Sequence, residues 1–224
     1  MNRLVFDIET VGTDFNALDE HSQEYLTKGK ETEEELKMVK EGMGFSPLTG
    51  QIVAIGALNP DTGKGAVYYQ SPGADAAEKE QEDVRMVSVP TEKELLEKFW
   101  EAAAHYRQFV TFNGRAFDAP FIIVRSAVNH VKPTRNLMPY RYGDDHIDLY
   151  DRLGFFNAVR RNMNLHMWCQ ALGIASPKTH GVTGYDVASL FRDGRYGDIA
   201  KYCMDDVYAT AELFRYWDEY VNIK

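Results

Sequence analysis

Short apolar runs separated by polar segments predict an alternation of strands and helices along the chain. Strands are predicted at residues 1–10, 51–58, 65–70 and 109–112, with a short last strand at 147–149. The turn at 59–63 contains Pro60 and Gly63 and is too short for a crossover, so its two flanking strands should be antiparallel neighbours. The pattern therefore predicts a mixed sheet.

Periodic apolar positions predict helices between these strands. Thr91 and Glu94 have the spacing of a capping box, and they begin a helix that runs to about Tyr106. Residues 72–90 are predicted to be loop. Further helices are expected at about 118–129, 164–172 and 199–220. Strands that alternate with helices in this way indicate an α/β fold with helices packed on the faces of the sheet.

A length of 224 residues suits one domain, and we expect a single domain over 1–224. Residues 14–42 are polar, charged and rich in helix formers, and they predict a charged insertion of one or two exposed helices. No apolar run approaches a membrane span, and no signal segment precedes the first strand, so we expect a cytoplasmic protein without a membrane partner. Only Cys169 and Cys203 occur, which excludes a disulfide framework and a four-thiolate zinc site.

The net charge of −9 argues at first against a nucleic-acid partner, because phosphates attract Lys and Arg. The acidity is local, however. Residues 14–41 and residues 75–101 each carry nine acidic and four basic residues, and the rest of the chain carries 17 basic and 16 acidic residues. A nucleic-acid surface outside the two acidic segments is therefore compatible with the charge.

Two carboxylates, Asp7 and Glu9, follow each other closely at the end of the first predicted strand. Strand side chains alternate, so both should point to one face while Phe6 and Ile8 point to the other. Two neighbouring carboxylates repel unless a counter-charge is present, and a divalent cation such as Mg²⁺ provides one. The alternative is a strand end in open solvent, where paired charges cost little.

A third carboxylate, Asp118, lies in the stretch "TFNGRAFDAPFI" between a predicted strand and a helix. It is a candidate for the same site. Asp is also a preferred N-cap residue, and Pro120 would fall in the first helical turn. The alternative interpretation is therefore a helix cap, and the two roles are compatible.

The last helix contains the stretch "YCMDDVYAT" with two adjacent acids. At about 100° per residue, Asp206 falls roughly 50° from the centre of the apolar stripe, and Asp205 falls roughly 150° away. Asp205 should therefore be solvated, whereas Asp206 leans toward the sheet with Tyr202 one turn before it. Pairing with a basic residue is the alternative role for Asp206. The residues of the stripe are Ile199, Cys203, Val207, Thr210 and Phe214.

Three motifs thus occur in order along nearly the whole chain: Asp7-x-Glu9, then Asp118 after Asn113 and Phe117, then Tyr202-x-x-x-Asp206. This trio resembles the DEDDy branch of 3′-to-5′ exonucleases. The stretches "FDIET", "FNGRAFDAPF" and "YCMDD" are especially similar to the proofreading exonuclease domain of B-family DNA polymerases. The resemblance implies a ribonuclease H-like fold with a mixed five-stranded sheet flanked by helices.

The resemblance also implies a metal-dependent 3′-5′ exonuclease in which four carboxylates hold two Mg²⁺ or Mn²⁺ ions. Two ions about 4 Å apart activate the attacking water and stabilise the leaving 3′ oxygen. Tyr202 would orient that water, because a phenol with a pKa near 10 is a poor base at neutral pH. The expected catalytic residues are Asp7, Glu9, Asp118, Tyr202 and Asp206, of which the four carboxylates are the expected metal ligands.

The implied partner is a nucleic acid with a free 3′ end; single-stranded DNA is favoured and RNA is also compatible. Thr10 and Asn113 would contact the terminal nucleotide, and Phe117 would stack or wedge against its base. Thr10 as a loop cap and Phe117 as a core residue are the alternatives. Protein partners and the oligomeric state are not determined by the sequence.

Other residues have weaker functional interpretations. His146 and Asp148 could bind a metal, although a His beside a short strand more often satisfies a local hydrogen bond. The scattered basic residues could contact a nucleic-acid backbone or be ordinary surface. Among them are Arg141, Lys178, Lys201 and those of 160–164. The aromatic residues could offer stacking faces or pack in the core. They are Tyr140, Tyr142, Phe155, Phe156 and Trp168.

Two rival functions stay open at this point. A catalytically silent nucleic-acid-binding or scaffolding module on the same fold would keep the motifs without turnover. A small-molecule phosphoesterase on another α/β scaffold would explain the carboxylates but not the order of the motifs.

Overall fold

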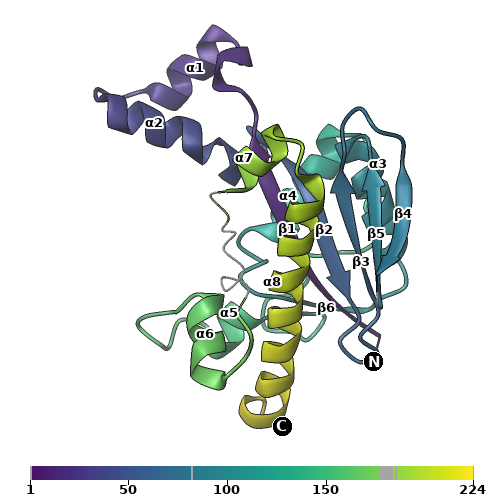
Figure 1. Ribbon diagram of the computed structural model, residues 1–224. Coiled ribbons are helices and arrows are strands. Elements are labelled where there is room, and N and C mark those ends of the chain that lie inside the picture. Colours follow the sequence, from purple (N-terminus) through teal and green to yellow (C-terminus); the bar gives the residue numbers. More distant parts are fainter. Residues whose placement is uncertain (1, 82, 177–183, 185, 224) are drawn as a thin grey trace.

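The computed structural model describes residues 2–81, 83–176, 184 and 186–223, and these contain a mixed sheet of seven strands (Figure 1). The strand order is β4-β5-β3-β2-β1-β6-β7. The strands are β1 (Arg3–Gly12), β2 (Gly50–Leu58), β3 (Gly65–Gln70), β4 (Ala77–Gln81), β5 (Val84–Val89), β6 (Gln108–Thr111) and β7 (His146–Asp148).

Strand β1 lies near the middle of the sheet and joins its antiparallel and parallel parts. It pairs antiparallel with β2 and parallel with β6, and β6 pairs parallel with β7. Strands β2 and β3 are antiparallel neighbours, so the prediction from the short turn at 59–63 is confirmed. The α/β class with a mixed sheet is confirmed with them.

The prediction of a loop over 72–90 is wrong, because β4 and β5 extend the sheet from five strands to seven. Strand β5 pairs parallel with β3, and β4 pairs antiparallel with β5. Every residue of β4 is exposed and its sequence is AEKEQ, so no apolar alternation marks it as a strand. Charged side chains of this kind are usual on the outermost strand of a sheet, where they discourage pairing with other chains.

Helices cover both faces of the sheet (Figure 1). Helices α3 and α4 pack on one face, while α5, α6 and α8 pack on the other. In the part of the chain that the structure describes, no helix is both long and apolar enough to cross a membrane. The helices of the two faces are α3 (Glu92–Ala103), α4 (Asp118–Val128), α5 (Leu149–Leu153), α6 (Leu165–Leu172), α7 (Val187–Arg192), α8 (Tyr196–Tyr216) and the π-helical η4 (Trp217–Val221).

Two exposed helices, α1 (Glu20–Thr27) and α2 (Glu33–Glu41), project from the body as an arm that is visible in Figure 1. None of their residues is buried, in line with the exposed helices expected at 14–42. Short 3-10 turns, η1 (Phe15–Ala17) and η2 (Gly42–Phe45), lead into and out of the arm.

The base of the arm is fixed to the end of β1. The Thr10 hydroxyl donates a 2.8 Å hydrogen bond to the carbonyl of Gly44. A Cβ on Gly12 would lie 2.6 Å from the Cβ of Met43, so only glycine allows η2 to approach β1 this closely. The arm is therefore anchored one residue beyond Glu9.

Candidate active site

Asp7 and Glu9 lie on the same side of β1, because side chains alternate along a strand. Phe6 and Ile8 point to the opposite side, into the core formed with α3 and α4. Glu9 is buried and Asp7 is half-buried, and β1 continues beyond both of them to Gly12. The interpretation of this pair as a strand end in open solvent is therefore wrong.

Asp118 is the first residue of α4 and not its N-cap residue. Phe117 is the N-cap residue, and no side chain caps this helix. The Asp118 carboxylate instead accepts a 3.0 Å hydrogen bond from the backbone amide of Ile8. Strand β6 pairs with β1 only as far as Val5, so this part of β1 is open to the first turn of α4. The helix-cap interpretation is wrong, and the contact joins Asp118 to the strand that carries Asp7 and Glu9.

Helix α8 brings the third element to the site. All five residues of its predicted apolar stripe are buried, so the assignment of the core-facing side is confirmed. Asp206 and Asp7 line the same cavity, which has a volume of about 890 Å³. Asp205 is half-buried and not fully solvated, and it lines a different cavity with Ile174 and Tyr208. The two adjacent acids therefore face different surroundings.

The four carboxylates of Asp7, Glu9, Asp118 and Asp206, which we call the acidic cluster, influence one another strongly. Burial raises the pKa of Asp7 well above its usual value, and the three other charges raise it further. Burial also raises the pKa of Glu9, with added contributions from Asp206 and Asp118. Burial raises the pKa of Asp118 to about 7, although the hydrogen bond from Ile8 opposes this increase. Each of the four acids therefore contributes to the electrostatic environment of at least one other member of the cluster.

The acidic cluster suits a divalent cation. The structure shows no ion pair between Asp7, Glu9 or Asp118 and any Lys, Arg or His among the residues it describes. Buried carboxylates without a cationic side chain lack the counter-charge that their ionised forms need. Hard cations such as Mg²⁺ prefer carboxylate oxygens, so the donor set fits such an ion.

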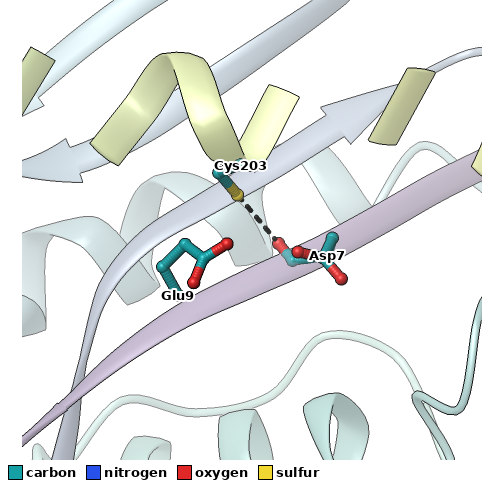
Figure 2. Close-up of side chains that lie close together, drawn as sticks. All are labelled: Asp7, Glu9 and Cys203. Carbon is teal, nitrogen blue, oxygen red and sulfur yellow. Dashed lines mark hydrogen bonds between the residues drawn. The ribbon is translucent and has the colours of Figure 1, made fainter. Parts of the chain in front are cut away.

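Cys203 lies close to the acidic cluster, although the sequence did not indicate this proximity. Potential ligand atoms of Asp7, Glu9 and Cys203 lie within 4.8 Å of one another, and Figure 2 shows the thiol above β1. The thiol donates to the carbonyl of Asp7 at 3.5 Å and accepts from the amide of Gly56 at 3.1 Å. A Cβ on Gly56 would lie 2.8 Å from Val207, so the missing side chain lets α8 approach β2 closely.

The environment of Cys203 argues against a role as a metal ligand. Burial raises the pKa of its thiol well above the usual value, and the charges of Asp7, Glu9 and Asp206 raise it further. Its thiol already makes two hydrogen bonds, and the hard ions Mg²⁺ and Mn²⁺ prefer oxygen to sulfur ligands. Its place in the apolar stripe of the last helix was the only sequence signal for its position.

Tyr202 lies one helical turn before Asp206 and contacts the acidic cluster through its hydroxyl. Burial raises the pKa of Tyr202 well above its usual value. The charges of Asp206, Glu9 and Asp7 and a hydrogen bond with the Asp206 side chain raise it further. The phenol is therefore protonated at neutral pH and can donate a hydrogen bond but cannot take up a proton.

The predicted nucleotide-contacting residues lie in two cavities that flank the acidic cluster. Asn113 lines the 890 Å³ cavity with Asp7 and Asp206. Thr10 and Phe117 line a second cavity of about 430 Å³, which also contains Glu9 and residues of the arm. The Thr10 hydroxyl is already bonded to Gly44, and Phe117 packs against Phe121 with ring centres 5.3 Å apart.

His146 and Asp148 serve structural roles. The two ring nitrogens of His146 lie 2.8 Å from the Leu137 carbonyl and 2.8 Å from the Thr111 hydroxyl. Burial lowers the pKa of this imidazole to about 4, so it is neutral at physiological pH. The local hydrogen-bonding interpretation of His146 is confirmed.

Asp148 fixes the loop that carries Asn113. Its carboxylate accepts hydrogen bonds from the backbone amides of Asn113, Arg115 and Tyr150 at 2.8, 2.9 and 3.0 Å. Asn113 has a φ of 64°, and a carboxylate that binds two amides of its turn stabilises this left-handed conformation. Asp148 thus acts on the site through the position of Asn113.

The basic residues singled out in the sequence are used in different ways. Arg141 forms a two-point ion pair with Asp151, at 2.8 and 2.5 Å. Arg161 lines the 890 Å³ cavity, whereas Lys178 lies outside the described residues. Trp168 is partly buried and packs against the core beneath α8, as the core interpretation predicts.

Comparisons with known proteins relate the chain to exonuclease domains. Residues 73–218 match a family described as a predicted 3′-5′ exonuclease related to the exonuclease domain of PolB. The matched range contains Asp118, Tyr202 and Asp206, whereas Asp7 and Glu9 precede it. No match is found among curated proteins.

The fold is similar to that of the family B DNA polymerase from the hyperthermophilic archaeon Pyrobaculum calidifontis. The TM-score is 0.59 at 17% sequence identity, and the alignment covers 96% of this chain and 24% of the polymerase chain. The chain therefore spans about a quarter of the polymerase's length. The similarity confirms the ribonuclease H-like α/β fold expected from the sequence, with seven strands in place of five.

Proposed function

Because the chain belongs to the family of predicted 3′-5′ exonucleases related to the exonuclease domain of PolB, we propose that it hydrolyses phosphodiester bonds at the 3′ end of nucleic acid. The observation that carries this proposal is the acidic cluster. The charges of Glu9, Asp118 and Asp206 raise the pKa of Asp7, and Asp7 and Asp206 line an open cavity. A folded chain gains no stability from such repulsion, so the cluster needs a functional explanation.

Asp7, Glu9, Asp118 and Asp206 are the residues that would hold two Mg²⁺ or Mn²⁺ ions. Bound ions would lower the pKa of the attacking water and stabilise the charge that develops on the leaving 3′ oxygen. The burial and mutual repulsion of the four carboxylates support this assignment, since a cation offsets both costs. The hydrogen bond from Ile8 holds the Asp118 carboxylate in one orientation before any ion binds.

Tyr202 is proposed to orient the attacking water and not to deprotonate it. Its raised pKa keeps the hydroxyl protonated, and its hydrogen bond with Asp206 aims it at the acidic cluster. Water adds to the terminal phosphorus, and the bond from phosphorus to the 3′ oxygen breaks. The products are a nucleoside 5′-monophosphate and a strand that is one nucleotide shorter and ends in a 3′ hydroxyl.

The two cavities suggest how the strand lies in the site. Asn113, Asp7 and Asp206 line the larger cavity, which adjoins Arg161 and other polar residues. The smaller cavity contains Glu9, Thr10 and Phe117 and has no Lys or Arg in the described part of its lining, so it suits a base better than a phosphate. The relation to a DNA polymerase domain favours single-stranded DNA as substrate, with RNA as the alternative. A cytoplasmic location and a single domain with an inserted arm stay predictions.

A degradation assay tests the proposal directly. A single-stranded 20-nucleotide DNA labelled at its 5′ end should shorten in one-nucleotide steps with Mg²⁺ or Mn²⁺ and stay intact with EDTA. The matching RNA and duplex measure the substrate preference, and Asp7→Ala is the inactive control. A wild-type protein that binds the strand but releases no mononucleotide with either ion would instead be a catalytically silent binding module.

A further inference from the structure

Exposed aromatic side chains gather on the two segments that flank α5. Tyr140 is 74% exposed and Tyr142 is 57% exposed. The ring centres of Tyr140 and Tyr142 are 5.6 Å apart, and those of Tyr142 and Phe156 are 4.7 Å apart. Tyr140, Tyr142 and Phe156 thus form a continuous row of rings at the surface, which we call the aromatic platform. Phe155, 58% exposed, lies beside Phe156 in the chain.

The backbone that carries Phe156 has an unusual conformation. Phe155, Phe156 and Asn157 have φ angles of 47°, 53° and 73°, a left-handed region that bulky residues rarely adopt. The amide of Phe156 bonds to the carbonyl of Asp151 at 2.8 Å, and the Arg152 guanidinium lies 5.4 Å from the Phe156 ring. Strain of this kind persists where surrounding contacts impose it, and it is concentrated at binding sites. Here it holds Phe156 against Tyr142 and leaves Phe155 in solvent.

Unpaired positive charge lies next in the chain. Arg152 is paired with Asp144 at 2.9 Å, so it adds little net charge to this surface. Arg160 and Arg161 are exposed, and neither has an ion pair or hydrogen bond with the described residues. Arg161 also lines the cavity that contains Asp7.

A small cavity of about 250 Å³ adjoins the larger cavity and is lined by chain neighbours of the platform residues. Asn113 and Tyr150 line both cavities. Arg141, which lies between the two tyrosines of the platform in sequence, and Asn157, which follows Phe156, also line the small cavity. The two adjoining cavities therefore lead from the chain neighbours of the exposed rings to Asp7 and Asp206.

We propose that the aromatic platform together with Arg160 and Arg161 binds the single-stranded part of a nucleic acid whose end lies at the acidic cluster. Bases would stack on the rings, and the two arginines would contact backbone phosphates. Base–aromatic stacking with basic side chains alongside is the usual chemistry of single-strand recognition. The direction of the strand toward the acidic cluster rests on the proposed exonuclease function.

A second copy of the chain is a poorer occupant of this surface. In a symmetric dimer the same patch of both copies lies in one interface, so the unpaired arginines of both copies would enter an interface in which the aromatic platform offers them no counter-charge. A nucleic-acid strand offers negative charge and flat bases, which complement both features of the patch.

Binding measured without turnover tests the proposal. The probes are a fluorescein-labelled 20-nucleotide oligothymidylate and the matching oligouridylate, titrated with protein in EDTA and followed by fluorescence anisotropy. Tyr142→Ala and Tyr140→Ala should each weaken binding by about 5- to 100-fold, the effect of losing one stacked base. Tyr142→Phe keeps the ring and should bind like wild type. Tyr25→Ala is the matched control, because Tyr25 is 78% exposed on α1 and lies outside the platform.

The salt dependence of binding tests the arginines separately. The double variant Arg160→Ala/Arg161→Ala should reduce the slope of log affinity against log salt by about 1.4, or about 0.7 for each phosphate contact on a single strand. The control removes the same charge from the arm with Lys28→Ala/Lys30→Ala, and it should leave the slope nearly unchanged. An equal loss of slope in both double variants would indicate general attraction and overturn the proposed contacts.

The remaining outcomes separate this proposal from the proposed function. If both Tyr142→Ala and Tyr140→Ala bind the oligonucleotides as tightly as wild type, the proposed role of the platform is overturned and the exonuclease proposal is unaffected. A dimer that Tyr142→Ala breaks, with no loss of strand binding, overturns it in favour of an interface between copies. If the variants lose binding as expected but the wild-type protein releases no nucleotides in Mg²⁺, the platform is supported and the exonuclease proposal is contradicted. Both tyrosines are exposed, so unchanged thermal melting of the variants confirms that folding is not the cause.

Discussion

The backbone amide of Ile8 donates a 3.0 Å hydrogen bond to the carboxylate of Asp118, and the two residues are 110 positions apart in the chain. This bond joins β1 to the first turn of α4 where the pairing of β6 with β1 has ended. A buried amide needs a partner, and a carboxylate supplies a strong one. The same carboxylate faces the charges of Asp148 and Asp206, so one group serves both the fold and the acidic cluster.

The metal-free protein should lose stability as the pH rises. Burial raises the folded-state pKa of Asp118 to about 7, above its usual value of 3.8. The folded state therefore holds more protons than the unfolded state between these values, and the free energy of unfolding decreases with pH in that window. We expect the melting temperature in EDTA to be lower at pH 8 than at pH 5, by about 2–4 °C for each 1 kcal/mol lost.

The variant Asp118→Asn is the control for this pH dependence. An asparagine oxygen still accepts the bond from Ile8, but the group no longer ionises. The decrease in melting temperature between pH 5 and pH 8 should be smaller in this variant than in wild type. Added Mg²⁺ should raise the wild-type melting temperature more at pH 8 than at pH 5. The same pH dependence in both proteins would show that Asp118 is not the titrating group.

The adjacent residues Asp205 and Asp206 form a matched pair of substitutions on α8. Asp206→Asn should lower kcat by at least about 10²-fold, because the variant removes one charged member of the acidic cluster. Asp205→Asn should change kcat little, since Asp205 lines a different cavity with Ile174 and Tyr208. Nucleotide release at saturating Mg²⁺ measures both. An active Asp206→Asn with an inactive Asp205→Asn would reverse the proposed roles of the two acids.

Tyr202→Phe should lower kcat by about 10- to 10³-fold, the effect of one hydrogen bond to a reacting group. Metal affinity should barely change, because the phenol is not among the proposed ligands, and folding should survive because the ring volume is kept. The decisive measurement is the pH–rate profile of both proteins at saturating Mg²⁺. Burial keeps the pKa of Tyr202 high, so the two profiles should have the same shape below about pH 10.

A limb that rises with pH in wild type and is absent from Tyr202→Phe would contradict this orienting role and indicate a general base. A limb present in both proteins belongs to another group, since a water bound to a metal can titrate as well. Full activity in the variant would remove Tyr202 from the mechanism.

Cys203→Ala should destabilise the fold and leave kcat nearly unchanged. The variant leaves the amide of Gly56 without its acceptor, which costs about 1–3 kcal/mol for a buried donor. Urea unfolding measures this loss. The value of kcat at a temperature where the variant is folded should stay close to wild type, because Mg²⁺ and Mn²⁺ prefer oxygen ligands and the thiol is not among the proposed ones.

Cys203→Ser separates the structural role of the thiol from coordination. A serine hydroxyl can replace the acceptor for Gly56, so stability should recover in part. A marked decrease in Mg²⁺ affinity in both variants would identify the thiol as a ligand and contradict its assignment as a hydrogen-bonding group.

Several features follow from the sequence alone because they depend on local geometry. The alternation of side chains along a strand places Asp7 and Glu9 on one face, away from Phe6 and Ile8. The helical period identifies the buried stripe of α8, and the spacing of Thr91 and Glu94 locates the start of α3. The order of the three motifs, read as a resemblance, predicts the family and fold class that the comparisons support.

Other features depend on which elements meet, and the periodicity of a single element does not contain this information. The edge strand β4 forms only because β5 offers a free edge, and its charged sequence carries no apolar pattern. Asp118 has the residue type and position of a helix cap, yet its carboxylate bonds to Ile8 because β6 ends early beside β1. The thiol of Cys203 reaches the carbonyl of Asp7 because Gly56 lets α8 approach the sheet. Register, strand length and close approach between distant segments are set by packing of the whole chain, so they were decided only by the tertiary structure.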